Sequence, residues 1–363
     1  MPDPFLAYIS QGQLYLQSEG VGSIVESPFG QSIRDRAIQI YNRNAWKTNG
    51  RGGQALIRTM KSNAACEPPE LPIDITSVTG GSRPGEIFYT LETNEISGVF
   101  ARNGDGVERR LFHTADYRLR HPDVHPSGSE VAISIYHANG AANLALLSAD
   151  GSDLTEITDG ESIDEGPRWM PGSKRRMVFQ SAGLARTPRG RPSSHGPFSI
   201  QQIDLETGDM SSLAHDDHFD FLWPRVAPDG TLYYIRRPNE SLPKKSESLD
   251  ALGALKDVAL LPFRFLLAIG LFMDMATGRK ITSRLMRPGG PVKPSAPSTW
   301  HLMRHSPNAA TPETIAQNVL AYGLSSDGSI IHTNGMDIYQ LPAAGGSGNK
   351  LLTGVDIDRI AAF

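Results

Sequence analysis

The chain of 363 residues carries a net charge of −4 at pH 7, so its total charge does not point to nucleic acid or to any other strongly charged partner. Its single cysteine, Cys66, excludes an internal disulfide and an all-cysteine metal site, which fits a reducing compartment. With 36 Gly, 26 Pro and few long helical patterns, the composition favours short strands joined by tight turns.

The N-terminal region predicts strands from residue 5 onward. The segments FLAYIS, GQLYLQS and GSIVES are short and apolar, and we expect them to supply three strands. No basic segment followed by an apolar core, the pattern of a secretory signal, precedes them. We therefore expect a cytoplasmic protein, with a peripheral membrane location as the alternative.

Residues 29–73 are expected to form a basic, helical insertion. Ser32 supplies a helix start signal, and Ile33 and Ile40 share one helical face of SIRDRAIQIYNRNAWK. Residues 30–62 hold seven Lys/Arg against one acid. We expect this helix to pack on the rest of the fold with its basic residues in solvent.

One pattern recurs between residues 74 and 354: a Pro, an apolar residue two positions later, a Pro/Gly turn and a short apolar strand. Each copy predicts a hairpin in which a turn glycine, such as Gly128 or Gly230, takes a positive φ. Two further strands follow each hairpin, and four strands in about 45 residues are typical of one β-propeller blade. We count five blades in this range. The clearest copies are HPDVHPSGSEVAIS at 121–134, GPRWMPGSKRRMVF at 166–179 and WPRVAPDGTLYYI at 223–235, with weaker copies from Thr79 and Tyr322.

Residues 182–197 (AGLARTPRGRPSSHGP) are expected to be a mobile loop insertion rich in Arg, Pro and Gly. Arg186, Arg189 and Arg191 have no acid near them in the sequence. They could clamp a phosphate or carboxylate, and they could equally belong to a solvated loop without a ligand.

The segment HDDHFD, residues 215–220, is a candidate metal site in a loop between blades. His215, Asp216, Asp217 and His218 could offer mixed nitrogen and oxygen ligands. This would support an alternative function, a metal-dependent lyase or hydrolase with its site in the central funnel. The preceding inter-blade loop is also acidic but lacks histidine. An ordinary polar loop is therefore the competing interpretation, and we assign no metal and no cofactor.

Loops between blades also place acidic residues on the face that carries the insertions. In one interpretation the positive charge of the insertions and the negative charge of these loops neutralise each other. In the other, the acidic funnel receives a basic peptide or side chain from a partner. The acidic residues that we expect at the funnel mouth are Asp164, Glu165, Asp217 and Asp220.

Motifs of catalysis do not occur. The chain has no nucleophile elbow, Walker loop, zinc-protease helix or dinucleotide fingerprint. His121 and His125 are four residues apart on a predicted strand, about 13 Å, which is too far to share a metal ion. We expect these histidines to be structural or solvent-facing, and the protein not to be an enzyme.

Residues 239–297 form the largest predicted insertion, basic and apolar, with nine Lys/Arg and five acids. Its segment 258–273 is apolar apart from Arg264 but shorter than the roughly 20 residues of a spanning helix. We expect this segment to be covered by the propeller itself, by a partner protein or by a membrane surface. The candidate partner-binding residues here are Phe263, Phe265, Leu266, Leu267, Leu271 and Phe272.

The C-terminal segment VDIDRIAAF predicts one further inner strand. Together with the three N-terminal strands it would complete a sixth blade, and joining the two ends removes exposed strand edges. We therefore predict that residues 1–363 form a single all-β domain. It would be a six-bladed β-propeller of four-stranded antiparallel blades, closed by pairing its N- and C-terminal strands, with helical insertions on one face.

The W/V-x-P-x-G segments and the polar inter-blade loops resemble the WD-like propeller repeats of TolB-type proteins. The resemblance covers roughly residues 74–363 and, through closure, residues 5–27. It implies the architecture only. TolB proteins are periplasmic scaffolds with an additional N-terminal domain, and neither feature matches this chain.

The three insertions are expected on one face. In a blade of alternating strands, the loop between strands two and three emerges on the same side as the loop to the next blade. Residues 30–62, 182–197 and 239–297 together carry a net charge of +13, which leaves −17 for the rest of the chain. We predict a non-catalytic scaffold that binds one or more protein partners through this face. The alternative is peripheral recruitment to an anionic membrane surface or nucleic acid.

Overall fold

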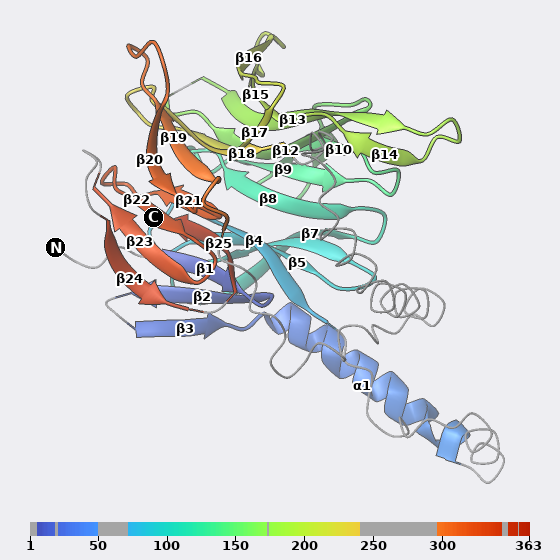
Figure 1. The fold of residues 1–363 in the computed structure, drawn as a ribbon. Coiled ribbons are helices and arrows are strands. Elements are labelled where there is room, and N and C mark those ends of the chain that lie inside the picture. Colours follow the sequence, from blue (N-terminus) through green and yellow to red (C-terminus); the bar gives the residue numbers. More distant parts are fainter. Residues whose placement is uncertain are drawn as a thin grey trace, which may run out of the picture. The chain divides into compact units, whose positions relative to one another are not determined.

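The structure is a computed structural model that describes residues 6–18, 21–49, 72–172, 174–239, 296–342, 348–354 and 356–363. The chain divides into two compact units, Met1–Asn239 with Ser295–Phe363, and Glu240–Pro294. The second unit lies outside the described residues. The first unit is built almost entirely of strands (Figure 1).

Four of the sheets in the described part of the chain have four strands each, and every pairing within them is antiparallel. In order of pairing, they are β25 (Ile357–Ala362), β1 (Leu6–Ser10), β2 (Gln13–Ser18) and β3 (Val21–Val25); β4 (Asp74–Gly80), β5 (Ile87–Glu92), β6 (Ser97–Arg102) and β7 (Glu108–Thr114); β17 (Phe219–Val226), β18 (Leu232–Pro238), β19 (His301–His305) and β20 (Glu313–Gln317); and β21 (Ala321–Leu324), β22 (Ile330–Thr333), β23 (Asp337–Leu341) and β24 (Asn349–Thr353).

The first of these sheets joins the two ends of the chain, as predicted. β25 pairs with β1 in antiparallel register, with Leu6 opposite Ala362 and Ala7 opposite Ala361. The three N-terminal strands therefore continue outward from a C-terminal inner strand. Because β25 and β1 are paired, the backbone groups on the edges that they turn towards each other are not left exposed.

A larger, nine-stranded sheet differs from the expected separate blades. It consists of two antiparallel runs that a single parallel bridge, Ala142 to Ile163, connects. The side chain of Ala142 is only a methyl group, which lets the two backbones approach at the strand ends. The strands of the first run are β8 (Arg118–Val124), β9 (Glu130–Tyr136), β10 (Ala142–Ser148) and β11 (Leu154–Glu156), and those of the second are β12 (Ser162–Trp169), β13 (Arg176–Arg186), β15 (Ser199–Asp204) and β16 (Met210–Ala214), with β14 (Pro192–His195) beside the end of β13.

The hydrophobic core lies between neighbouring sheets. Leu14 of the terminal sheet packs in one cluster with Tyr89 and Phe100 of the β4–β7 sheet. On the other side of the terminal sheet, Leu6 packs with Ile331 of the β21–β24 sheet. Both faces of the closing sheet are therefore buried. Burial of this kind stabilises the ring by about 25 cal/mol for each Å² of apolar surface removed from water.

The turns between the first and second strands follow the repeat. Gly128 and Gly230 have φ of 73° and 85°, and their amides donate to the carbonyls of His125 and Ala227. Because these φ values are strained for residues with a Cβ, glycine is favoured at both turns. This prediction is confirmed.

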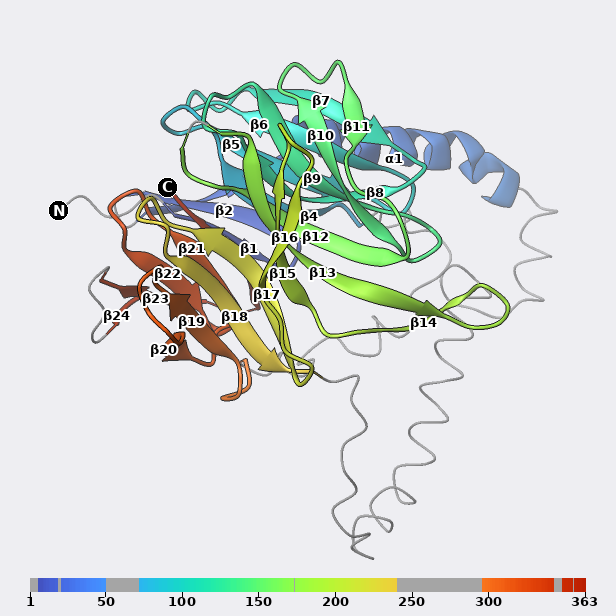
Figure 2. The same cartoon turned by 90° about the horizontal axis from the view of Figure 1, so that it is seen from above.

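The helix α1 (Pro28–Asn49) occupies the first part of the 29–73 insertion. Its first turn packs on the β4–β7 sheet, where the Phe29 ring lies 5.0 Å from the Phe100 ring and the Phe29 amide donates to Glu108. Farther along, Ile40 is 58% exposed. The helix extends away from the sheets (Figures 1 and 2), so the expectation that it packs along the propeller is wrong. Residues 50–71 lie outside the described part of the chain.

Residues 182–197 form a β-hairpin, not the expected irregular loop. β13 continues past its sheet to Arg186, and β14 pairs with this extension, Leu184 opposite His195. Gly190 has φ of 75° in the connecting turn. The Pro and Gly residues that suggested a loop thus serve the turn and the edge strand of a hairpin.

Candidate functional site

Three inner strands share an irregularity immediately before a proline. His121 and Trp223 have positive φ of 58° and 57°, and the equivalent Gly166 has 66°. The strand register shifts at each of these points, in β8, β12 and β17. Such bulges re-aim the side chains that follow, and they cost free energy that the surroundings must offset.

A side chain of the neighbouring strands satisfies each bulge amide. The His121 amide donates to Ser77 Oγ at 3.0 Å, and the Trp223 amide donates to Gln180 Oε1 at 2.6 Å. The Gly166 amide likewise donates to Ser134 Oγ at 3.0 Å. All three acceptors belong to a preceding sheet or run, so these bonds fasten adjacent parts of the ring together.

The bulged strands line two neighbouring cavities, which we call the outer and the inner part of the central cavity. A wide outer part of about 610 Å³ is lined by the turns between first and second strands together with Asp123, Trp169 and Phe363. A narrow inner part of about 30 Å³ is lined by residues of β4, β8, β12, β17, β21 and β25. Arg168 and Arg225 line both parts. The inner part is lined by Ser77, Val78, His121, Arg168, Trp223, Arg225, Ala321, Tyr322, Arg359 and Ile360.

Asp123 is a carboxylate that lines the outer part of the cavity. It accepts from Arg168 Nη1 at 2.8 Å and from the Trp169 amide at 2.8 Å. Thr79 Oγ1 also donates to it. The acid thus joins β4, β8 and β12, and its one ion pair among the described residues is with Arg168.

The other two arginines have no carboxylate of their own among the described residues. Arg359 stacks on the Trp223 ring, 4.5 Å from its centroid, and its buried Nε lacks a hydrogen-bond partner. Arg225 makes no ion pair or side-chain hydrogen bond with any described residue. Burial, reinforced by Arg168, lowers the pKa of Arg225 to about 10. Its guanidinium therefore stays charged at neutral pH, facing the cavity.

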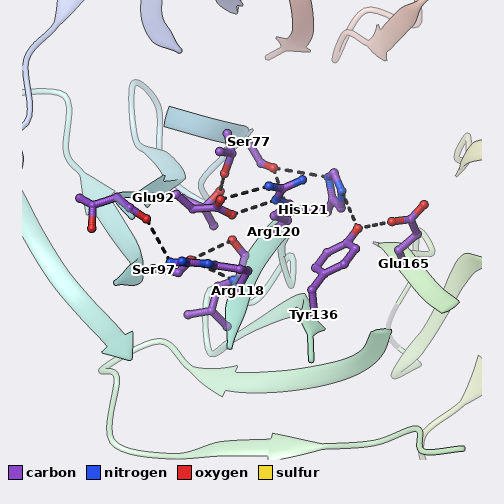
Figure 3. Close-up of polar contacts among 12 residues, drawn as sticks. Ser77, Glu92, Ser97, Arg118, Arg120, His121, Tyr136 and Glu165 are labelled. Atoms are coloured by element: carbon purple, nitrogen blue, oxygen red, sulfur yellow. Dashed lines mark hydrogen bonds and ion pairs between the residues drawn. The ribbon is translucent and has the colours of Figure 1, made fainter. Parts of the chain in front are cut away.

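A chain of polar contacts borders the inner cavity (Figure 3). Tyr136 donates to Glu165, so its oxygen accepts from His121 Nε2 at 3.1 Å. His121 Nδ1 is then left as an acceptor for Ser77 Oγ at 3.4 Å. Burial, followed by the charges of nearby arginines, holds the pKa of His121 well below its usual value. A neutral His121 fixes the bulge rather than adding charge to the cavity.

The acids predicted at the funnel mouth do not act together. Asp164 accepts from Ser181 Oγ at 2.6 Å, and Glu165 accepts from Gln180 and Tyr136. Asp220 is buried and pairs with Arg237 at 3.0 Å. Only Asp217 is solvated. The picture of one acidic mouth is therefore wrong, because three of the four acids have partners within the strands.

The loop candidates for a metal site stay in solvent. His215 contacts Asp217 at 3.1 Å, and the His218 amide donates to Asp216. Within the residues that the structure describes, no three His, Cys, Asp or Glu side chains lie close enough to hold a metal ion. The loop therefore does not fit the metal site considered above.

The predicted partner-binding residues separate into three groups. Arg186 pairs with Glu161 and donates to the carbonyl of Asn139, so it fixes the hairpin. Arg189 and Arg191 are exposed at the hairpin turn. The third group, Phe263, Phe265, Leu266, Leu267, Leu271 and Phe272, lies with the whole 258–273 segment outside the described residues.

Sequence reasoning missed the arginines of the central cavity. Their signal was present in the repeat itself: a proline follows each bulge, and the next residue is Asp123, Arg168 or Arg225.

Comparisons with solved structures agree with this arrangement. A TolB from Acinetobacter baumannii superposes with a TM-score of 0.55 at 11% identity, over 99% of this chain and 66% of that chain. A chain of the nidogen/laminin complex gives 0.54 at 7% identity, over 99% and 97%. The tricorn protease gives 0.51 at 11%, over 97% and 33%. The architecture is that of a TolB-like β-propeller.

The likeness that these comparisons give is structural. No protein-family model matches this chain, and no curated protein matches it. The TolB-like propeller spans slightly less than two thirds of the TolB chain, and identities of 7–11% establish the fold alone. Function must therefore be argued from the described surfaces and cavities.

Proposed function

We propose that this chain is a non-catalytic, six-bladed propeller scaffold that binds a protein partner with an acidic surface through the end that carries α1 and the β13–β14 hairpin. Six blades follow if the two antiparallel runs of the nine-stranded sheet count as one blade each. A single bridge joins those runs, whereas each run is itself paired along most of its length.

The observation that carries this proposal is that two basic elements project in the same direction. α1 connects β3 to β4 and the hairpin lies between β13 and β15, and both extend to the right in Figures 1 and 2. Arg34, Arg36 and Arg43 are exposed on α1, and Arg189 and Arg191 are exposed on the hairpin. Positive groups on rigid supports favour and steer the binding of an acidic partner.

Exposed apolar surface on α1 supports a protein rather than a small ligand. Ile40 is 58% exposed on the same helix, among the arginines. An apolar side chain within a polar surround is typical of protein interfaces. A chain of the nidogen/laminin complex has the same fold, which is consistent with a binding role but does not identify a partner.

Peripheral attachment to an anionic membrane surface is the alternative function. In the part of the chain described here, no helix combines the length and apolar character that crossing a bilayer requires. We propose a cytoplasmic location, and vesicle binding serves as an outcome of the test below.

The test uses charge reversal on the two projecting elements. Proteins that co-purify with the full chain from its host are identified by mass spectrometry. Each is then purified and titrated against wild type and against a variant carrying Arg34→Glu, Arg36→Glu and Arg189→Glu. We expect at least about tenfold weaker binding by the variant, with a reduced dependence on salt. Arg83→Glu, an exposed change in a turn lining the outer cavity, is the matched control.

Two results would overturn the proposal. One is a partner whose affinity is the same for wild type and the triple variant but falls with Arg83→Glu. The other is the absence of any acidic protein partner together with flotation on phosphatidylserine vesicles that the triple variant loses.

A further inference from the structure

We propose that the central cavity binds a carboxylate, held at its inner end by Arg225 with Arg168 and Arg359. The site is separate from the surface of α1 and the hairpin, and the proposal does not depend on the function assigned to that surface. It rests on an excess of buried positive charge, on the shape of the cavity and on the residues around it.

The described side chains that line the inner end of the cavity include three arginines and no carboxylate. Asp123 pairs with Arg168 and also accepts from a backbone amide. It attracts Arg225 too, and Glu165 and Asp358 attract Arg359, but burial outweighs these attractions and lowers the pKa of both arginines. Burying positive charge is costly unless an anion is near, and Arg225 makes no ion pair with any described residue, so these arginines favour an anion bound in the cavity.

Arg225 and Arg359 can also donate hydrogen bonds to a ligand in the cavity. Arg225 has donors to spare, because no described residue accepts a hydrogen bond from its side chain. Arg359 is held in place by its stacking on Trp223, and its Nη1 donates to the carbonyl of Asp358. Guanidinium groups fixed in this way can offer paired N–H donors, the pattern that a planar carboxylate accepts.

The size and lining of the cavity define the rest of the ligand. The inner part, about 30 Å³, has room for a small anionic group only. It shares Arg168 and Arg225 with the outer part of about 610 Å³, which Trp169, Leu324 and Phe363 help to line. A carboxylate attached to an apolar or aromatic body would fill both parts. Two sources have this chemistry, a free organic acid and the C-terminal end of a peptide.

The experiment compares matched charged and neutral probes by isothermal titration calorimetry at low salt. N-acetyl-phenylalanine is expected to bind, and N-acetyl-phenylalaninamide, which lacks the carboxylate, is not. Phenylpropionate and an acetylated tripeptide ending in Phe separate the two sources: the tighter of these identifies whether a free acid or a peptide end is preferred. Inorganic phosphate is titrated as the competing anion.

Variants test where the probe binds. Arg225→Met is expected to weaken binding of N-acetyl-phenylalanine at least about tenfold, because it removes charge-assisted hydrogen bonds. Arg225→Lys is expected to restore part of the affinity. Arg189→Met, at the exposed hairpin turn, is the control and is expected to bind like wild type.

Stability distinguishes a ligand site from a structural one. Without ligand, Arg225→Met is expected to unfold at the same temperature as wild type or about 2 °C higher, since it removes a buried charge that makes no ion pair with any described residue. A variant that unfolds well below wild type would assign Arg225 a structural role and overturn the proposal. Equal carboxylate binding by Arg225→Met and wild type, binding of phosphate alone, or no binding of any carboxylate probe to folded wild type would also overturn it.

Discussion

At the scale of single residues, burial of His332 couples stability to pH. His332 lies in β22, stacks on Tyr339 and has a buried Nδ1 without a partner. Burial lowers its pKa from 6.5 to about 4. Between these values the unfolded chain takes up a proton that the folded chain does not, so stability is lost as the pH falls below 6.5.

This coupling predicts the behaviour of His332→Leu. Wild type should lose about 2 kcal/mol through this group between pH 7 and pH 5, and the variant should lose correspondingly less. Urea unfolding at several pH values, followed by tryptophan fluorescence, measures the difference. His218→Asn, at a histidine whose side chain is 80% exposed, is the control. If the free energy of unfolding fell equally with pH for His332→Leu and wild type, the prediction would be contradicted.

Single residues also show where sequence reasoning reached its limit. Gly128 was predicted in its turn because the demand for positive φ is local. His121 was not predicted in the same conformation, because a residue before proline ordinarily takes an extended one. Its conformation depends on Ser77, 44 positions earlier, which accepts from its amide. Asp220 was likewise placed at the funnel mouth because its ion pair with Arg237 appears only when β17 and β18 pair.

At the scale of elements, the turn between β10 and β11 shows how closely adjacent sheets pack. Gly151 has φ of 83°, and a Cβ there would lie 2.2 Å from the carbonyl oxygen of Leu111 in β7. Gly208 has φ of 79° in the equivalent turn between β15 and β16, but nothing lies within 4 Å of its Cβ position. A Cβ at Gly208 would therefore cause backbone strain alone, whereas a Cβ at Gly151 would also collide with the neighbouring sheet.

Alanine at these two positions should have unequal effects. Gly208→Ala is expected to lower the free energy of unfolding by about 1–2 kcal/mol through backbone strain alone. Gly151→Ala should cost about 1–3 kcal/mol more, because the turn or β7 must move. Urea unfolding of both variants is the measurement. If both variants lost the same free energy of unfolding, β7 and the turn would have moved apart without an energetic penalty, and the prediction would be wrong.

Among the elements, strands were predicted better than insertions. Regular apolar strands and their turns carry a local pattern, and the four-stranded units followed from it. The β13–β14 hairpin has polar strands outside any core, so Pro188 and Gly190 suggested a loop. α1 was expected to pack because Ile33 and Ile40 share a face, yet its first turn, around Phe29, provides the contact. Periodicity predicts a helix but does not say what covers it.

At the scale of the whole described unit, closure of the ring explains how the cavity can hold buried arginines close to its centre. Each inner strand contributes to the inner cavity, and the last of them, β25, brings Arg359 against Trp223 of β17. Strained bulges and crowded cations persist only where the surrounding structure holds them in place. The pairing of β25 with β1 supplies that constraint, because it ties the end of the chain to its beginning.

A disulfide across this closure tests the ring directly. Ala7 and Ala361 are opposite each other, both buried, and opposed residues of antiparallel strands have Cα atoms about 4.5–5.5 Å apart, within the range of a disulfide. In a Cys66→Ser background, Ala7→Cys with Ala361→Cys should form the bond and raise the free energy of unfolding by up to about 5 kcal/mol, because it closes a very long loop in the unfolded chain. The gain should disappear on reduction, and neither single cysteine variant should show it. A bond that fails to form under oxidising conditions, with the protein folded, would mean that the two strands are not paired in this register.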